Sequence, residues 1–213
     1  MSLVFCCTPE NDLFRVLSAS GAAPLRFDTA EEVVAAAPDG AGVLLLADGY
    51  PETATAVGAA TYARAAEKGL RLYVEYPDSL PGIDVGEARG TIWERAVIAS
   101  DLFAPAVERL RILAIHDCRF LPVQAERPHV VVARVAGFDT AVYGLPDETF
   151  PILFEHPGGG ILVATTKLSQ FVTARYAPTD AWQAIWRAIL SWLDADGDAP
   201  ALDWVPSVRP AHL

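Results

Sequence analysis

The sequence is short of basic residues. Lys and Arg total 16 against 27 Asp and Glu, so the formal net charge at pH 7 is -11. Proteins that bind nucleic acid need a basic stripe or patch that displaces counterions from the phosphate backbone. The composition therefore predicts no nucleic-acid partner.

Long apolar runs are also missing. A membrane-spanning helix needs roughly 18 to 20 consecutive apolar residues, and no run in this sequence reaches that length. The first residues, MSLVFCCTPEND, contain neither the basic n-region nor the cleavage site of a signal peptide. We expect no membrane partner and a cytoplasmic location.

Cysteine is scarce, with only Cys6, Cys7 and Cys118. The count is odd and two of the three are adjacent within an apolar run, which suits a disulfide framework poorly. This pattern predicts reduced thiols in a reducing compartment, with Cys6 and Cys7 buried on a first strand.

Several signatures of catalysis and ligand binding are absent, namely G-x-S-x-G, the Walker loop, G-x-G-x-x-G and H-E-x-x-H. Asp194, Asp196 and Asp198 alternate as in a calcium loop, but Gly197 comes too early and no Glu occupies the twelfth position. We therefore expect no cofactor and no metal. Residues 194–213 are interpreted as an acidic, proline-containing tail or linker.

What the sequence does have is a core-forming composition, with 52% hydrophobic and 20% charged residues over 213 positions. Up to residue 77, short apolar runs alternate with amphipathic or Ala-rich helical patterns. Strands are expected at 3–7, 24–27, 42–47 and 70–74, and helices after an Asn11 cap, at 30–37 after an Asp28 or Thr29 cap, and at 53–68. Such alternation predicts a doubly wound parallel sheet covered by helices.

The second half is rich in strand patterns. Strands are expected at 95–100, 112–115, 130–135, 140–143, 152–156 and 161–165. The PGGG sequence at 157–160 predicts a hairpin turn, and a Trp-rich apolar face predicts a last helix from a Thr179 cap to Leu193. The predicted fold class is α/β, a flavodoxin-like three-layer sandwich with a mostly parallel sheet and a β-rich, partly antiparallel C-terminal half. Residues 1–193 are expected to form one domain.

Polar residues follow several of the predicted parallel strands. Ligands of doubly wound sheets bind at the carboxyl ends of the strands, which makes the informative positions Thr8, Asp48, Gly49, Tyr50, Glu75 and Tyr76. Glu75 follows a buried strand, so its carboxylate must be solvated, paired or functional. Lys167 follows another strand and is its candidate ion-pair partner. Structural pairing and ligand contact both stay open.

Two further groups of polar residues are weaker candidates. His116, Asp117 and Cys118 follow the run ending at Ile115 and contain the types needed for a base, an orienting group and a thiol. The alternative is a turn with a capping Asp and a hydrogen-bonded His. His156 is expected at the exposed end of the hairpin, without a catalytic role.

The segments GVLLLADGYP, LRLYVEYP and PILFEHPGGGILVATTKL together resemble the class I glutamine amidotransferase-like fold. The resemblance covers most of residues 1–193, and its nearest forms are the trehalose-utilisation (ThuA-like) proteins and the β-galactosidase trimerisation domain. It implies a Gly-x-Cys-x-Gly elbow where this sequence has Val74-Glu75-Tyr76, and a histidine where it has Lys167. Amide hydrolysis by a Cys-His pair needs a thiolate and an adjacent base. The resemblance therefore implies a non-catalytic relative.

The first functional hypothesis is an accessory or binding domain of a larger carbohydrate-processing protein, with a downstream catalytic domain as partner. Its pocket would take a small polar or sugar ligand at Asp48, Tyr50, Glu75, Tyr76 and Lys167.

Two alternatives stay open. One is a small-molecule hydrolase or isomerase with Glu75 as general base, assisted by Lys167 or His116. The other is a homo-oligomerisation module with Trp204 or Phe171 at the subunit interface.

Overall fold

The computed structural model describes residues 3–21, 24–115, 117–172, 179–194 and 202. Its strands are β1 (Val4–Cys6), β2 (Leu25–Phe27), β3 (Gly42–Leu45), β4 (Arg71–Glu75), β5 (Arg89–Gly90), β6 (Arg95–Ile98), β7 (Ile112–Leu113), β8 (Arg119–Phe120), β9 (Pro128–Ala133), β10 (Phe150–Glu155) and β11 (Ile161–Ala164). The helices are α1 (Asp12–Ala19), α2 (Ala30–Ala36), α3 (Ala59–Glu67), α4 (Thr179–Leu193) and the 3-10 helix η1 (Leu168–Val172).

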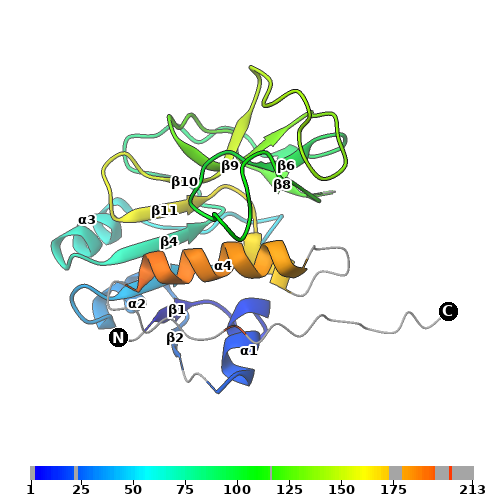
Figure 1. Cartoon of the computed structure of the whole chain (residues 1–213). Coiled ribbons are helices and arrows are strands. Elements are labelled where there is room, and N and C mark those ends of the chain that lie inside the picture. The colour runs from blue at the N-terminus through cyan, green and yellow to red at the C-terminus, as the bar shows by residue number, and fades with distance from the viewer. Residues whose placement is uncertain (1–2, 22–23, 116, 173–178, 195–201, 203–213) are drawn as a thin grey trace.

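A nine-stranded mixed sheet runs through the molecule in the order β2-β1-β3-β4-β11-β10-β9-β6-β7 (Figure 1). The pairs from β2 to β11 are parallel, and the pairs from β11 to β7 are antiparallel. β5 and β8 form a separate two-stranded sheet. The predicted fold class is confirmed as an α/β three-layer sandwich, with mostly parallel central strands and antiparallel strands in the C-terminal half.

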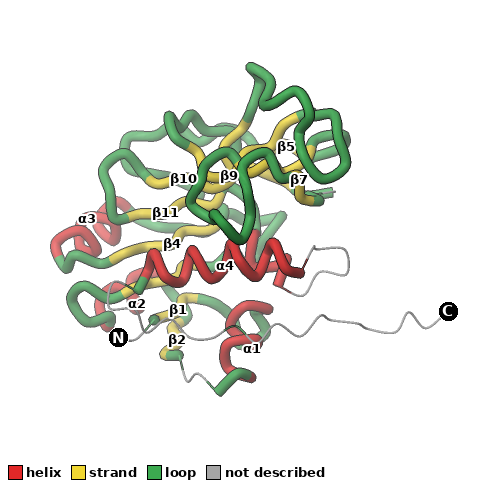
Figure 2. Tube along the Cα trace, viewed as in Figure 1, coloured by secondary structure: helices red, strands yellow, loops and turns green. Residues whose placement is uncertain are grey.

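Alternating side chains of the central strands build the two sides of the sandwich. On β4, Tyr73 joins the cluster that contains side chains of α1, η1 and α4, whereas Leu72 and Val74 join the cluster with side chains of α2 and α3. Successive residues of a strand point to opposite faces, so each face of the sheet has its own helical cover. Figure 2 shows these helices around the parallel part and mainly strands and loops in the rest. Within the described ranges, no helix combines the length and apolar character needed to cross a membrane.

Two helices begin at the predicted caps. The Asn11 side chain accepts hydrogen bonds from the Leu13 and Phe14 amides at the start of α1. The Thr29 hydroxyl accepts from the Glu32 amide while the Glu32 carboxylate accepts from the Thr29 amide, which is a capping box. These caps satisfy amides that have no partner inside the helix.

Two predicted elements differ most from the observed ones in extent. The helix expected at 53–68 begins only at Ala59, because Thr55 is held in extended backbone by bonds from its amide and hydroxyl to the carbonyls of Tyr76 and Glu75. The strand expected at 140–143 is reduced to one isolated bridge between Thr140 and Arg111. Long-range bonds decide the first case, whereas in the second the Val142 and Gly144 amides donate to the nearby carbonyls of Ala136 and Ala141 and so form turns.

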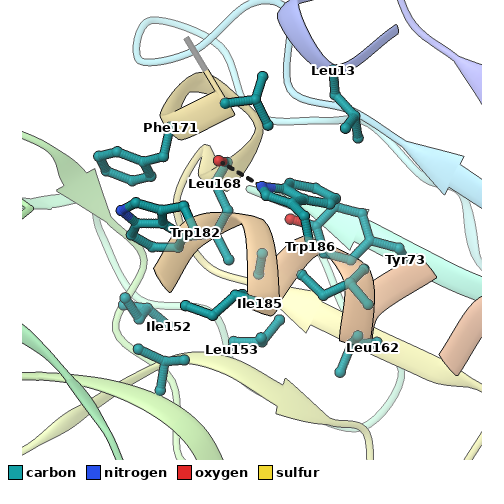
Figure 3. Close-up of a cluster of buried hydrophobic side chains, with 14 of the residues drawn as sticks. Leu13, Tyr73, Ile152, Leu153, Leu162, Leu168, Phe171, Trp182, Ile185 and Trp186 are labelled. Carbon is teal, nitrogen blue, oxygen red and sulfur yellow. Dashed lines mark hydrogen bonds between the residues drawn. The ribbon is translucent and has the colours of Figure 1, made fainter. Parts of the chain in front are cut away.

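Helix α4 covers β4 and the strands beside it with the predicted apolar face, as Figure 3 shows at close range. Trp182, Ile185, Trp186, Ile189 and Leu193 are all completely buried. The Trp186 ring packs edge-on against Tyr73 at 5.3 Å between centroids, and its indole N–H donates to the Leu168 carbonyl at 3.3 Å. One side chain thus connects α4, β4 and η1.

Phe171 is not available for a subunit interface, which corrects the sequence-based expectation. Only 7% of its surface is exposed, because its ring stacks on Trp182 at 4.4 Å with an interplanar angle of 5°. Trp204 and almost all of the predicted tail at 194–213 lie outside the described residues.

Replacing Trp186 by Ala should lower the free energy of unfolding by about 3–5 kcal/mol, since a large buried ring and its hydrogen bond are lost together. Urea unfolding followed by circular dichroism measures the change. Trp93→Ala is the matched control, because Trp93 is 74% exposed and surface changes usually stay within about 0.5 kcal/mol. Equal losses in the two variants would contradict this description of the core.

Candidate functional site

The carboxyl ends of the parallel strands meet at one edge of the sheet, as predicted. The Thr8 amide, after β1, donates to the carboxylate of Asp48, which lies after β3. The Asn11 side chain donates to the same carboxylate at 2.7 Å. The ends of β4 and β11 approach each other there through a bond from the Ser169 amide to Glu75. Residues separated by more than 90 positions are therefore neighbours at this edge.

Glu75 is completely buried at the last position of β4. Its Oε1 accepts hydrogen bonds from the Ser169 amide at 2.7 Å and from the Tyr73 hydroxyl at 3.1 Å. Its Oε2 accepts from the Ser169 hydroxyl at 2.8 Å and from the Ala47 amide at 3.1 Å. The carboxylate thus holds together the residues after β3, the end of β4 and the start of η1.

Burial and hydrogen bonding act on Glu75 in opposite directions. Burial raises the pKa of its carboxyl above the ordinary value of 4.5, and it is the largest cause. The bonds from Ala47 and Ser169, and the positive charge of Lys167, act to lower the same pKa. With four donors on two oxygens and no exposed surface, Glu75 is placed to hold the fold together rather than to reach a substrate.

Lys167 forms its ion pair with Asp48 and not with Glu75. The Nζ lies 3.9 Å from Asp48 Oδ1, and both side chains are mostly buried, with 17% and 20% of their surfaces exposed. Glu75 is close enough to be affected by the charge of Lys167, but its oxygens are filled by neutral donors. The predicted Glu75–Lys167 ion pair is therefore replaced by the Asp48–Lys167 pair.

Tyr76 follows Glu75 with a left-handed backbone, at a φ of 49°. Such a conformation is uncommon for a bulky residue and is found often at functional turns. The Tyr76 ring packs edge-on against Tyr50 at 5.0 Å, and its hydroxyl bonds to the side chain of Arg119. Burial raises the pKa of Tyr76 more than Arg119 lowers it, so the hydroxyl is a neutral hydrogen-bonding group.

Tyr50 fixes the position of Arg119. Its hydroxyl accepts from the Arg119 amide at 2.6 Å and donates to the Arg119 carbonyl at 3.1 Å. The Thr166 hydroxyl, at the end of β11, donates to Tyr50 at 3.4 Å. The Arg119 guanidinium then reaches the Ala88 carbonyl at 3.3 Å. Tyr50 therefore joins β11 to β8 at the same sheet edge.

A cavity of about 600 Å³ opens beside these residues. Tyr76, Pro77 and Asp78 come from the end of β4, and Arg119 and Leu121 come from β8 and the residue after it. The remaining walls are two loops, which contribute Pro51, Glu52, Ala54, Val85, Gly86, Glu87 and Ala88. We call this space the β4 cavity.

The predicted ligand-binding set is divided by the structure. Tyr76 lines the β4 cavity, while Asp48 lines a second cavity of about 380 Å³ at the ends of β1 and β3. Glu75 lies beneath the edge with no exposed surface. Ala54 contributes to both cavities, so the loop after β3 forms the boundary between them.

Sequence reasoning missed several residues that build the edge. Ser169 supplies two donors to Glu75, and Arg119, Asp78 and Glu87 line the β4 cavity. Arg119 comes from a two-residue strand without a recognisable strand pattern. The one available signal was that polar residues follow β4 directly in the sequence. This signal points to Asp78 but not to Arg119.

The weaker candidates of the sequence analysis are the residues 116–118 and His156. Asp117 is exposed with a φ of 58°, Cys118 is buried, and His116 lies outside the described residues. His156 is half-buried at the hairpin turn, where its Nδ1 accepts from the Gly158 amide at 3.0 Å and its Nε2 bonds to the Pro81 carbonyl at 2.7 Å. In the part of the chain that is described, no group of three or more His, Cys, Asp or Glu side chains is arranged to hold a metal ion.

The three thiols should react slowly with an alkylating agent in the native protein. Burial raises the pKa of Cys6 and of Cys118 to about 11 and that of Cys7 to about 12, and the thiolate is the reactive form. Mass spectrometry after iodoacetamide treatment at neutral pH should find little modification, with all three sites modified in urea. Rapid alkylation of the native chain at any one site would contradict this.

Glu75→Gln should lower the free energy of unfolding by about 1–3 kcal/mol, because the amide NH₂ cannot accept the hydrogen bonds that one carboxylate oxygen receives. Urea unfolding measures the loss. Glu67→Gln, at the exposed end of α3, removes the same charge and should change stability by less than about 0.5 kcal/mol.

The loss in Glu75→Gln should also depend on pH. A carboxyl whose pKa is raised on folding stabilises the protein at pH values below its unfolded pKa, and this contribution disappears as the pH rises through the folded pKa. Since the pKa of Glu75 is raised from 4.5, the wild type should exceed the variant by more at acidic than at neutral pH. A difference that grows toward neutral pH would contradict the assigned direction.

Comparison with known proteins gives little. A scan against protein-family models finds no match, and a search of the curated proteins finds none either. Among solved structures, the chain is similar to PurLQS from Thermotoga maritima, with 14% identity, a TM-score of 0.46 and coverage of 90% of this chain and 98% of that chain. Because the likeness is weak, the fold class rests on strand order and layers.

Proposed function

We propose that this chain is a non-catalytic binding or accessory domain for a small polar ligand, of the sugar type, within a larger carbohydrate-processing protein of the cytoplasm. The resemblance to amidotransferase-like proteins, and to the trehalose-utilisation and trimerisation forms in particular, supports the accessory role. The observation that carries the proposal is the β4 cavity, which opens at the strand end where ligands of such sheets bind.

The chemistry of the β4 cavity suits a polyol. Tyr76 offers an aromatic surface with a hydroxyl, while Arg119 and the carboxylates of Asp78 and Glu87 offer donors and acceptors. Ligand sites commonly combine apolar walls with a few polar groups that fix orientation, and Pro51, Pro77 and Leu121 supply such walls here.

The same walls lack the usual means of covalent catalysis. Among the described residues that line the β4 cavity there is no Ser, Thr, Cys or Lys. Val74-Glu75-Tyr76 stands where the resemblance implies a Gly-x-Cys-x-Gly elbow, so no Cys nucleophile is present in that stretch, and burial raises the pKa of Tyr76. Binding is the function that these groups support best.

The alternative enzyme, with Glu75 as general base, receives less support from the geometry. A general base must reach the proton that it abstracts at hydrogen-bonding distance, directly or through one water. Glu75 has no exposed surface, and both of its oxygens already accept two protein hydrogen bonds each. A substrate would have to displace Ser169 or Ala47 to reach it.

Binding to a panel of mono- and disaccharides, measured by NMR chemical-shift titration, tests the proposal. Arg119→Ala should weaken the affinity for any sugar that binds by about tenfold, since a hydrogen bond from a charged group contributes roughly 1.5–3 kcal/mol and about 1.4 kcal/mol is a factor of ten in affinity. Arg109→Ala is the control, because Arg109 is exposed and lies outside the cavity. A panel in which no sugar binds, or equal affinity in both variants, would refute the proposed site.

An oligomerisation module remains a second candidate because of an exposed apolar patch. The six most exposed large hydrophobic side chains of the described residues include five from two segments, Ile92, Trp93, Phe138, Val142 and Tyr143. These five residues define the patch.

Both segments of the patch lie near the C-terminal end of β9. Arg95 pairs with Ala133, and Glu94 forms an ion pair with Arg134 at 2.9 Å just beyond that pair. The Val142 amide donates to the Ala136 carbonyl on the same side. With about 150–250 Å² for each aromatic ring, covering the patch would remove an area near the roughly 800 Å² per partner of a standard interface.

Light scattering tests this second candidate. If the patch joins two or more copies, the wild type should be an oligomer at micromolar concentration, and Phe138→Ser combined with Tyr143→Ser should yield monomers. Leu25→Ser, at the opposite edge of the sheet and 55% exposed, should leave the oligomer intact. A monomeric wild type removes this candidate.

A further inference from the structure

The charges around the β4 cavity are unequal. Glu52, Asp78 and Glu87 contribute three carboxylates to its walls, and Arg119 contributes the one guanidinium found among the described lining residues. The chain as a whole carries a formal net charge of -11. The local and overall fields therefore have the same sign, and both repel an anionic ligand.

The three carboxylates differ in whether they form hydrogen bonds or ion pairs within the protein. Asp78 accepts hydrogen bonds from the Val57 amide at 3.3 Å and the Ser79 hydroxyl at 3.1 Å. Glu52 and Glu87 are exposed and have neither a hydrogen bond nor an ion pair with any described residue. They come from the two different loops that flank the cavity, so their charges face the ligand space without a protein counterion.

Arg119 does not balance these charges fully. Its guanidinium already donates to the Ala88 carbonyl at 3.3 Å and bonds to the Tyr76 hydroxyl. Recognition of a carboxylate or phosphate by arginine usually uses two parallel N–H donors of one guanidinium. Because part of the guanidinium of Arg119 already bonds within the protein, Arg119 is better placed to bind a neutral hydroxyl than an anionic group.

We infer that the β4 cavity selects ligands by charge, taking an amine-bearing sugar in preference to a neutral sugar and rejecting sugar acids and sugar phosphates. The inference rests on the proposed binding function and adds the ligand class to it. Glu52 and Glu87 are the residues that set the preference, by attraction to the ammonium group from two sides.

The effect should be moderate and sensitive to salt. Exposed ion pairs contribute little individually because water and dissolved ions screen them. Two of them acting on one ammonium should give about a 3- to 10-fold preference at low ionic strength. The preference should shrink as salt is added, while the contribution of neutral contacts to affinity stays.

Titration of the full chain with glucosamine, N-acetylglucosamine and glucuronate, followed by NMR at low and at high salt, tests the inference. The three probes share a pyranose ring and differ in charge. Affinity should fall in the order given at low salt and converge at high salt. Glu52→Gln combined with Glu87→Gln should abolish the order, whereas Glu67→Gln combined with Glu108→Gln, which removes two exposed charges outside the cavity, should preserve it.

The outcomes separate the two proposals. Binding of all three probes with equal affinity, or an order that survives in the Glu52 and Glu87 double variant, overturns charge selection and leaves the binding function standing. Failure of every probe to bind overturns both the proposed function and the selection built on it.

Discussion

The buried carboxylate of Glu75 is the interaction on which the functional edge of the sheet depends. A charge without access to water is tolerated only when hydrogen bonds replace its hydration. Here four donors from the residues after β3, from β4 and from η1 do so. Because these donors come from distant parts of the sequence, one side chain holds the residues after β3 and the start of η1 against the end of β4.

This arrangement also explains where a ligand can bind. With Glu75 enclosed and Lys167 paired to Asp48, the charged residues nearest the sheet are used within the protein. The next residue, Tyr76, leaves the strand with a left-handed backbone and reaches Arg119. The polar groups that a ligand can reach therefore lie in the loops around the β4 cavity and not at the strand end itself.

Much of the fold could be predicted from local patterns. Caps at Asn11 and Thr29, buried apolar runs and the hairpin turn before Ile161 are signals within a few residues, and each is found in the structure. The start of α3 and the loss of a strand at 140–143 could not be predicted in this way. The first depends on hydrogen bonds from Thr55 to the distant Tyr76 and Glu75, and the second on turns in which Val142 and Gly144 donate to Ala136 and Ala141.

The sequence was enough to predict where the candidate site lies, but not which residues line it. The rule that ligands bind at carboxyl strand ends identified Glu75 and Tyr76 correctly as residues of that edge. It could not tell which of them is enclosed, because Ser169 closes over Glu75 from 94 positions away. Arg119 reaches the edge through its bonds to Tyr50, which no local pattern reveals.

Amide hydrogen exchange in the native protein tests the central role of Glu75 most directly. If its carboxylate holds the edge together, the amides of Ala47 and Ser169 should exchange only on global unfolding, with protection equal to that of the β4 amides. Exchange of either amide at the rate of an exposed loop would contradict the account.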